Sequence, residues 1–194
     1  MSDRAPRSQQ AVESQQASLR SVGGVATGNQ EAVDLADPAV GGANAVITRV
    51  VNAPADVVWS VLADGWLYAT WVVGASRIRE VDLGWPGVGS RVHHSFGIWP
   101  LVIDDTSEVL ISIPSRELKL RARGWPAGEA EVHLTLTPDR AEHTTVSIVE
   151  DAVAGPGSLI PRPVRQLVIA PRNVEALRRL ALIAEGRYRE QLQG

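Results

Sequence analysis

The 194-residue sequence contains no cysteine and no apolar run long enough to cross a bilayer. Without cysteine there is neither a disulfide nor thiolate chemistry. A transmembrane helix needs roughly 20 consecutive apolar residues, and no stretch approaches that length. The first residues, MSDRAPRSQQAVESQQ, also lack the apolar middle region of a secretory signal. We therefore expect a cytoplasmic protein without a transmembrane segment.

The sequence is also poor in net charge and in lysine. Its formal charge is -3 at pH 7 and its pI is near 5.8. Nucleic-acid binding draws much of its affinity from basic residues that neutralise phosphates, so nucleic acid is not an expected partner. Lys119 is the single lysine beside many arginines, a bias typical of GC-rich bacterial genomes. No motif indicates a cofactor.

Residues 1–43 show no apolar periodicity and are rich in Gln, Ser, Ala and Gly. Such a segment buries too little apolar surface to offset its ordering entropy, roughly 1 to 2 kcal/mol per residue for the backbone alone. The sequence therefore predicts a disordered N-terminal tail over 1–43 and one folded domain over 44–190.

The folded part begins with a β-branched strand that stops at Pro54 and a short amphipathic helix over 54–65. Six extended segments separated by Gly and Pro turns follow between about 75 and 151, and a helical period fills 160–186 with a kink or restart at Pro171. The sheet needs a cover for its apolar face, and the last helix is the only element large enough. We predict an α+β fold: a curved antiparallel sheet of about seven strands around a long C-terminal helix, with one or two short helices after strand 1.

Several segments together resemble a known family: VITRVVNAPADVVWSVLADG, ATWVVGASRIREVD, GVGSRV, PSRELKLRA and PRNVEALRRLALIAE. Their order and spacing over residues 45 to about 187 are similar to the polyketide cyclase/dehydrase branch of the SRPBCC superfamily, the START-related, helix-grip group. The resemblance implies a deep cavity between sheet and long helix that takes lipids, polyketides or steroids. It implies no single reaction, because members share a shape more than a catalytic motif.

Two of the four histidines are neighbours, His93 and His94. Adjacent strand residues point to opposite faces, so the pair does not ligate one metal, and no metal site is expected. His94 shares the predicted cavity face with Val92, Phe96 and Ile98, whereas His93 faces outward. An inward histidine can bond a ligand's oxygen or move a proton near neutral pH, or it can simply be a buried histidine with a structural hydrogen bond.

The same alternation predicts the inward residues of the later strands. Two Trp-Pro turns lie beside a Gly-Pro-Gly segment, where the tryptophans either form a ligand gate or cap the core at its rim. The predicted ligand-binding residues are Val92, His94, Phe96, Ile98, Trp99, Leu118, Leu120, Trp125, Leu134, Val146, Ile148 and Leu159. We expect Trp59, Trp66 and Trp71 to brace the helix link instead of contacting ligand.

Glu150 ends the inward series of the last strand, where it either serves a ligand or pairs with Arg162 or Arg165; a shift of one residue would give Asp151 this place. Asp104 and Asp105 interrupt an apolar strand and are interpreted as a bulge or an edge device. If the protein is an enzyme, His94 and Glu150 are its candidate catalytic residues.

Three functions stay open at this point. The first is a protein that binds, and either transports or sequesters, one hydrophobic small molecule. The second is a cyclase or dehydratase acting on a polyketide-like chain. The third is a protein-interaction module, which a small or filled cavity would favour. The arginines of 161–194 suit either a solvated helix face or transient contact with an anionic membrane.

Overall fold

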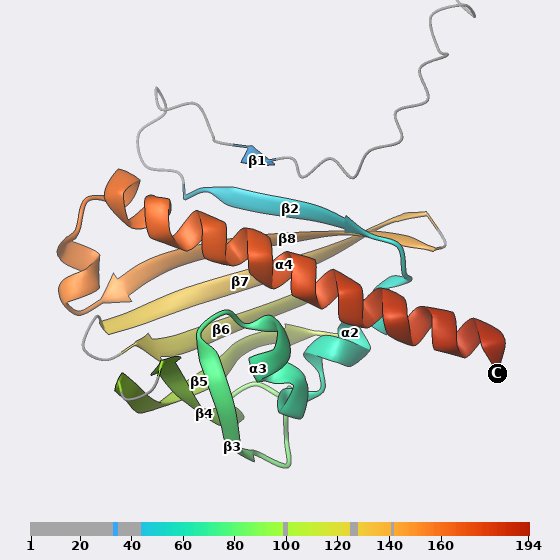
Figure 1. Ribbon diagram of the computed structural model, residues 1–194, viewed down its shortest axis with the longest axis horizontal. Helices are drawn as coiled ribbons and strands as arrows, with labels where there is room; N and C mark the ends of the chain where they lie inside the picture. The colour runs from blue at the N-terminus through green and yellow to red at the C-terminus, as the bar shows by residue number, and fades with distance from the viewer. Residues whose placement is uncertain (1–32, 35–43, 99–100, 125–127, 141) are drawn as a thin grey trace, which may run out of the picture. The chain divides into compact units, whose positions relative to one another are not determined.

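The computed structural model describes residues 33–34, 44–98, 101–124, 128–140 and 142–194 (Figure 1). Its elements are β1 (Val33–Asp34), β2 (Val46–Val51), α2 (Ala55–Leu62), η1 (Gly65–Leu67), α3 (Tyr68–Trp71), β3 (Ala75–Val81), β4 (Arg91–Ile98), β5 (Leu101–Ile113), β6 (Glu117–Gly124), β7 (Gly128–Arg140), β8 (His143–Ala154), η2 (Pro156–Leu159) and α4 (Arg162–Gln193). The strands form one antiparallel sheet in the order β1-β2-β8-β7-β6-β5-β4-β3. The predicted helix-grip fold is confirmed, with seven strands and the two-residue β1 beside β2.

A row of aliphatic side chains crosses the inner face of the sheet. Leu118, Leu134 and Ile148 stand opposite one another on β6, β7 and β8, and Ile47 of β2 pairs with Ile148. Each is at most 2% exposed. Burying such a side chain contributes roughly 1.5–3 kcal/mol to the free energy of folding. Because side chains alternate across a strand, the polar residues between these positions face the other side.

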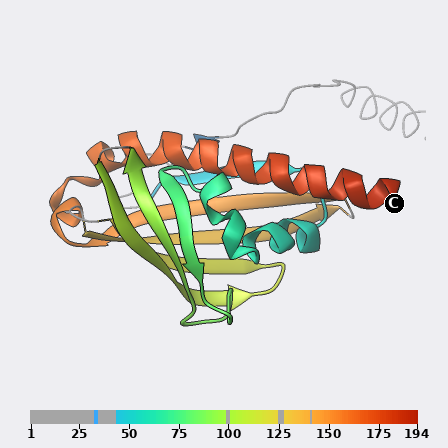
Figure 2. The same ribbon diagram turned by 60° about the horizontal axis from the view of Figure 1, so that its bottom comes forward.

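Helix α4 lies across one face of the sheet, as both views of the ribbon show (Figures 1 and 2). Its second half packs into the core through Ala176, Leu177, Leu180, Ala181 and Ala184, all 5% exposed or less. Two polar residues of the same half hold it against α2 and its flanking residues. Arg187 donates to the Ser60 carbonyl at 3.0 Å and pairs with Asp64 at 3.1 Å, and Glu185 accepts from Asn52.

Of the two alternatives expected at Pro171, a kink or a restart, the restart is excluded, because α4 is one helix of 32 residues that contains this proline. Proline removes a single intrahelical hydrogen bond. The residues after it are held in helical form by the core contacts of Ala176 to Ala184. The helix also reaches Gln193, beyond the predicted end at residue 186. Within the described residues, no helix is long and apolar enough to span a membrane.

The link between α2 and β3 closes one side of the molecule. Trp85 donates its indole N–H to the Leu62 carbonyl at 3.2 Å, which ties the turn after β3 to the end of α2. Gly74 has φ of +99°, and a Cβ there would overlap the Phe96 ring. Glycine at this position therefore lets Phe96 of β4 approach the backbone after α3, and this contact helps to place the wall of the site described next.

Candidate functional site: a pocket under the first half of α4

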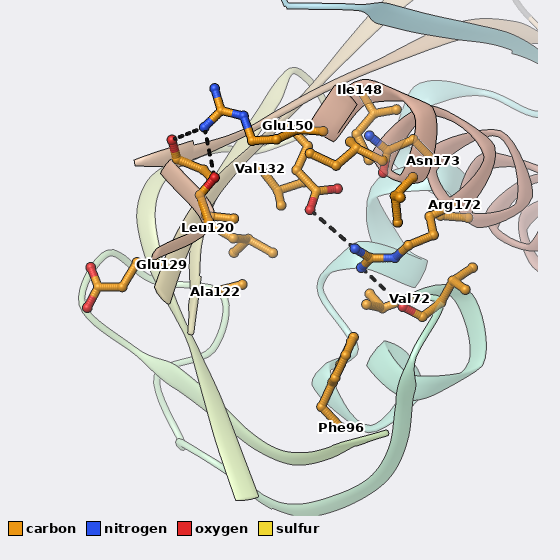
Figure 3. Close-up of a pocket in the computed structure, with 18 of the residues that line it drawn as sticks. Val72, Phe96, Leu120, Ala122, Glu129, Val132, Ile148, Glu150, Arg172 and Asn173 are labelled. Carbon is orange, nitrogen blue, oxygen red and sulfur yellow. Dashed lines mark hydrogen bonds and ion pairs between the residues drawn. The ribbon is translucent and has the colours of Figure 1, made fainter. Parts of the chain in front are cut away.

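A pocket of about 470 Å³ lies between the sheet, α3, η2 and the first half of α4 (Figure 3). The buried apolar residues of α4 begin at Ala176. In the turns before it, Ala170 and Val174 are partly buried against the core, and another face of the helix borders the pocket. The volume falls within the range of small-molecule sites. Its apolar lining comes from Trp71, Val72, Phe96, Leu120, Ala122, Ala130, Val132, Ile148, Ala152, Ile160, Val164, Val168 and Ile169.

A chain of three polar side chains lies at the inner end of this pocket. The Tyr68 hydroxyl is 2.7 Å from the Ser107 hydroxyl, which is 3.1 Å from Nε2 of His94. The Tyr68 and His94 rings are stacked, with centroids 5.1 Å apart and planes 11° from parallel. Both residues are at most 4% exposed. Nδ1 of His94 is buried and has no hydrogen-bond partner within the described residues.

Burial keeps both rings of this chain neutral at pH 7. It lowers the pKa of His94 to about 4 and raises the pKa of Tyr68 to about 12, because the charged form of each would lose its water. The Ser107 hydrogen bond and Arg172 oppose the rise for Tyr68 without cancelling it. A neutral imidazole can accept a proton or a hydrogen bond from a ligand, and a neutral phenol can donate one.

A second polar cluster lies where α4 faces the end of β8. Nη1 of Arg172 is 3.7 Å from Oε1 of Glu150, and Nη2 donates to the Val73 carbonyl at 3.3 Å. The guanidinium carbon also lies 5.6 Å from the centre of the Phe96 ring, a cation–π distance (Figure 3). Burial raises the pKa of the Glu150 carboxyl, while Arg172 and a hydrogen bond from Asn173 lower it in part. Glu150 is 7% exposed and therefore a potential proton donor inside the pocket.

Another arginine, Arg165, fixes the first turn of α4 beside the pocket. Arg165 pairs with Asp151 at 2.9 Å and donates to the Ala152 carbonyl at 3.2 Å, which fixes the start of α4 against the end of β8. Arg162 also lies near Asp151, at 3.6 Å. The arginines expected beside Glu150 thus pair with its neighbour, and Glu150 takes Arg172. Arg165 and Arg172 lie about two helical turns apart on α4, so the two acids meet different parts of the helix.

The structure places five of the sequence-predicted residues around the pocket: His94, Phe96, Leu120, Ile148 and Glu150. Four others, Val92, Leu118, Leu134 and Val146, share the inner face of the sheet but lie in the packed core, each fully buried. Leu159 is 84% exposed and does not line the pocket. Trp99 and Trp125 lie outside the described residues, as does the side chain of Ile98.

Sequence reasoning missed Tyr68, Ser107, Arg172 and Asn173, and it expected Trp71 to brace the helix link, whereas Trp71 lines the pocket. Tyr68 and Trp71 are three residues apart, so they share one face of α3, and this spacing was visible in the sequence. The isolated arginine in LVIAPRNVEAL was a further signal. Ser107 has no distinguishing sequence feature.

Asp105 is another buried acid close to this region. It stands directly opposite His94 in the unbroken β4–β5 register, so of the two alternatives expected for Asp104 and Asp105, a bulge or an edge device, the bulge is excluded. Pairing with β6 begins only at Ser107, which leaves this part of β5 with β4 as its one described neighbour. Burial raises the pKa of Asp105, against a hydrogen bond from the Thr106 amide. On the outer face His93 lies 3.5 Å from Asp82.

No group of three or more His, Asp or Glu side chains in the described segments is arranged to hold a metal ion. The site offers instead an apolar volume with two polar clusters, one neutral and one containing an arginine and a carboxyl. Such an arrangement can orient an oxygen-bearing hydrophobic molecule and exchange protons with it.

Several solved structures share this fold. The Zhui aromatase/cyclase from Streptomyces sp. R1128 has 26% identity and a TM-score of 0.51, covering 75% of this chain and 94% of its own. A protein from Rhodobacter sphaeroides has 20% identity and a TM-score of 0.58, covering 79% of this chain and 97% of its own. A protein from Chromobacterium violaceum has 18% identity and a TM-score of 0.55, covering 74% and 99%.

Among curated proteins no sequence matches this one. Residues 43–185 match the family described as polyketide cyclase / dehydrase and lipid transport. This match spans most of the chain and includes every residue of the pocket. The chain therefore belongs to the polyketide cyclase/dehydrase and lipid transport family.

Proposed function

We propose that the protein binds one hydrophobic small molecule, such as a lipid or a polyketide, in the pocket under α4. The observation that carries this proposal is the apolar volume of about 470 Å³ between the sheet and the first half of the helix. Family membership supports it, since the family's description includes lipid transport. The open volume also disfavours a module that acts only through protein contacts. The expected cytoplasmic location and the expected lack of a nucleic-acid partner belong to this proposal.

A larger side chain that fills the pocket is expected to weaken ligand binding. Ala122 lines it from β6, and Ala122→Trp would place an indole in the space for ligand. We expect the Kd for fluorescent lipid or steroid probes to rise at least tenfold, which corresponds to a loss of about 1.4 kcal/mol of binding free energy. Leu182→Trp is the matched control, because Leu182 is 53% exposed on α4 and does not line the pocket.

Native mass spectrometry of the freshly purified protein identifies a co-purifying ligand. A bound lipid or polyketide, absent from the Ala122→Trp variant, is the expected result. A protein that carries no bound species and takes up none of the probes would contradict the proposal.

A second candidate is a cyclase or dehydratase, favoured by the presence of a proton acceptor and a proton donor in one pocket. His94 is neutral and can accept a proton, and burial raises the pKa of Glu150, which makes its carboxyl easier to protonate and so able to pass a proton on. The aromatase/cyclase with 26% identity makes this reaction class the one to test. Ring closure or loss of water each needs a proton removed at one atom and supplied at another, which two such groups provide.

If this second candidate is correct, His94→Ala and Glu150→Gln each lower turnover of a polyketide substrate by about 10²- to 10⁴-fold, the usual contribution of a positioned acid or base. Single-turnover kinetics on the wild type and both variants measure the effect. Lys119→Gln, on the outer face of β6, serves as control. If turnover survives both pocket substitutions, neither His94 nor Glu150 is a catalytic residue. The rate acceleration would then come from orientation of the substrate in the pocket.

A further inference from the structure

Arg172 brings a cation into the pocket with hydrogen-bonding capacity to spare. A guanidinium has five N–H donors. One of them meets the Val73 carbonyl, and the contact of Nη1 with Glu150 is an ion pair at 3.7 Å. Nε has no hydrogen-bond partner within the described part of the chain. The side chain is 34% exposed, so a ligand in the pocket can reach it.

The other two arginines that line the pocket, Arg123 and Arg165, already pair with carboxylates. The Arg165 pair is shorter than that of Arg172, and Arg123 is more exposed than Arg172. Arg165 is paired with Asp151 at 2.9 Å and bonds two backbone carbonyls. Arg123 is 68% exposed at the rim and lies 3.8 Å from Glu129. Among the acidic side chains that the structure describes, Arg172 pairs with Glu150 alone, at 3.7 Å, and burial disposes this carboxyl toward its neutral form. When Glu150 is protonated, Arg172 becomes a partly buried cation that needs an anion.

We infer that Arg172 binds the carboxylate of an amphipathic acid, with an alkyl chain or polyketide in the apolar pocket, and that Glu150 takes up one proton as the acid binds. This inference rests on the proposed function and names the ligand class of the same site. A planar guanidinium matches a carboxylate with two parallel hydrogen bonds. The proton on Glu150 removes the repulsion between two carboxylates that would share one arginine.

The groups facing Glu150 set the expected pH dependence. Arg172 and Asn173 face it from α4, and Tyr68 interacts with it from α3. Tyr68 and the nearby His94 stay neutral between pH 6 and pH 8, so neither changes charge in this window. A ligand carboxylate is ionised throughout it. A loss of affinity with rising pH that is absent from Glu150→Gln therefore reports the proton taken up by Glu150.

The test compares dodecanoate with methyl dodecanoate and dodecanol by isothermal titration calorimetry at pH 6, 7 and 8. All three share one alkyl chain, and only the first carries a charge. We expect dodecanoate to bind about 10- to 100-fold more tightly than the ester, as hydrogen bonds to a partly buried charge suggest. Its Kd is expected to rise with pH by up to about tenfold per unit, whereas the Kd values of the neutral probes stay constant.

Two substitutions separate the roles of the pair. Arg172→Met keeps the length of the side chain, and in this variant the ratio of dodecanoate affinity to ester affinity is expected to fall to about one. Glu150→Gln keeps the shape and is expected to remove the pH dependence and to tighten dodecanoate binding at pH 8. Arg178→Gln is the matched control, because Arg178 lies on α4 outside the pocket and pairs with Glu175.

Each possible result decides the inference. Equal affinity for dodecanoate and its ester in the wild type overturns it and leaves the proposed function standing. A preference for the acid that persists in Arg172→Met also overturns it. Binding of none of the three probes overturns both the inference and the proposed function. The comparison of acid with ester is made within each variant, so a variant that folds poorly does not obscure the wild-type result.

Discussion

Replacing Gly128 by alanine is expected to destabilise the protein by about 3 kcal/mol or more. Gly128 begins β7 with φ of +118°, a conformation that L side chains rarely adopt. A Cβ at this position would overlap the Ala154 carbonyl oxygen and would lie 2.7 Å from its carbonyl carbon and from Cα of Gly155. The strain of the backbone and this overlap with rigid main-chain atoms both favour the unfolded chain. Urea denaturation of the wild type and the variant measures the difference.

The same substitution should also disturb the pocket, because Gly128 lines it and the end of β8 leads into η2. Gly186→Ala is the matched control. Gly186 lies in α4 with no atom within 4 Å of a Cβ built there, so alanine should stabilise the helix by roughly 0.5–1 kcal/mol. A Gly128→Ala protein as stable as the wild type would show that the start of β7 shifts away from β8 at little cost.

The sheet and the long helix could be predicted because each has a regular apolar period. Alternation at Leu118 and Leu120, and at Leu134 and Leu136, indicates one buried face whatever the tertiary details. The Gly and Pro turns on either side of each segment indicate where each strand begins and ends. Helix α4 was expected to kink or restart at Pro171, and it does not restart, because the local rule for proline takes no account of the packing that follows it.

The lining of the pocket was predicted less well, for a different reason. Leu118 and Leu120 have the same orientation on β6, yet only Leu120 reaches the pocket. Which of them meets a packed side chain depends on where α4 leaves the sheet. That point is set by contacts between residues more than 100 positions apart, such as Arg187 with Ser60. The alternation of apolar residues within one strand contains no information on where α4 separates from the sheet.

The polar clusters required long-range information as well. Tyr68 and Ser107 are 39 positions apart in the sequence, and Arg172 reaches back to Val73 across 99. A single serine or tyrosine in an amphipathic segment is compatible with a surface position. His94 could be assigned to the inner face because it follows the alternation of β4, but its partners could not be predicted.

Acidification is expected to cost about 3 kcal/mol of stability through His94 alone. The pKa of this residue is about 4 in the folded protein against 6.5 for a fully solvated histidine, because burial disfavours the imidazolium. The unfolded chain therefore binds more protons between these two values. The contribution of neutral His94 is complete above pH 6.5 and is lost as the pH falls through this window toward 4.

Other groups titrate in the same range with mixed signs, so the effect must be measured as a difference. Glu150 and Asp105 have raised pKa values and oppose His94, whereas Glu131 and Glu175 have lowered values and add to it. His94→Gln keeps a hydrogen-bonding side chain at this position without the titration. We expect the stability of the wild type relative to this variant, from urea denaturation, to fall by about 3 kcal/mol between pH 7 and pH 4. A constant difference would mean that the His94 ring is hydrated or paired when protonated, and its role as a neutral acceptor in the pocket would then fail.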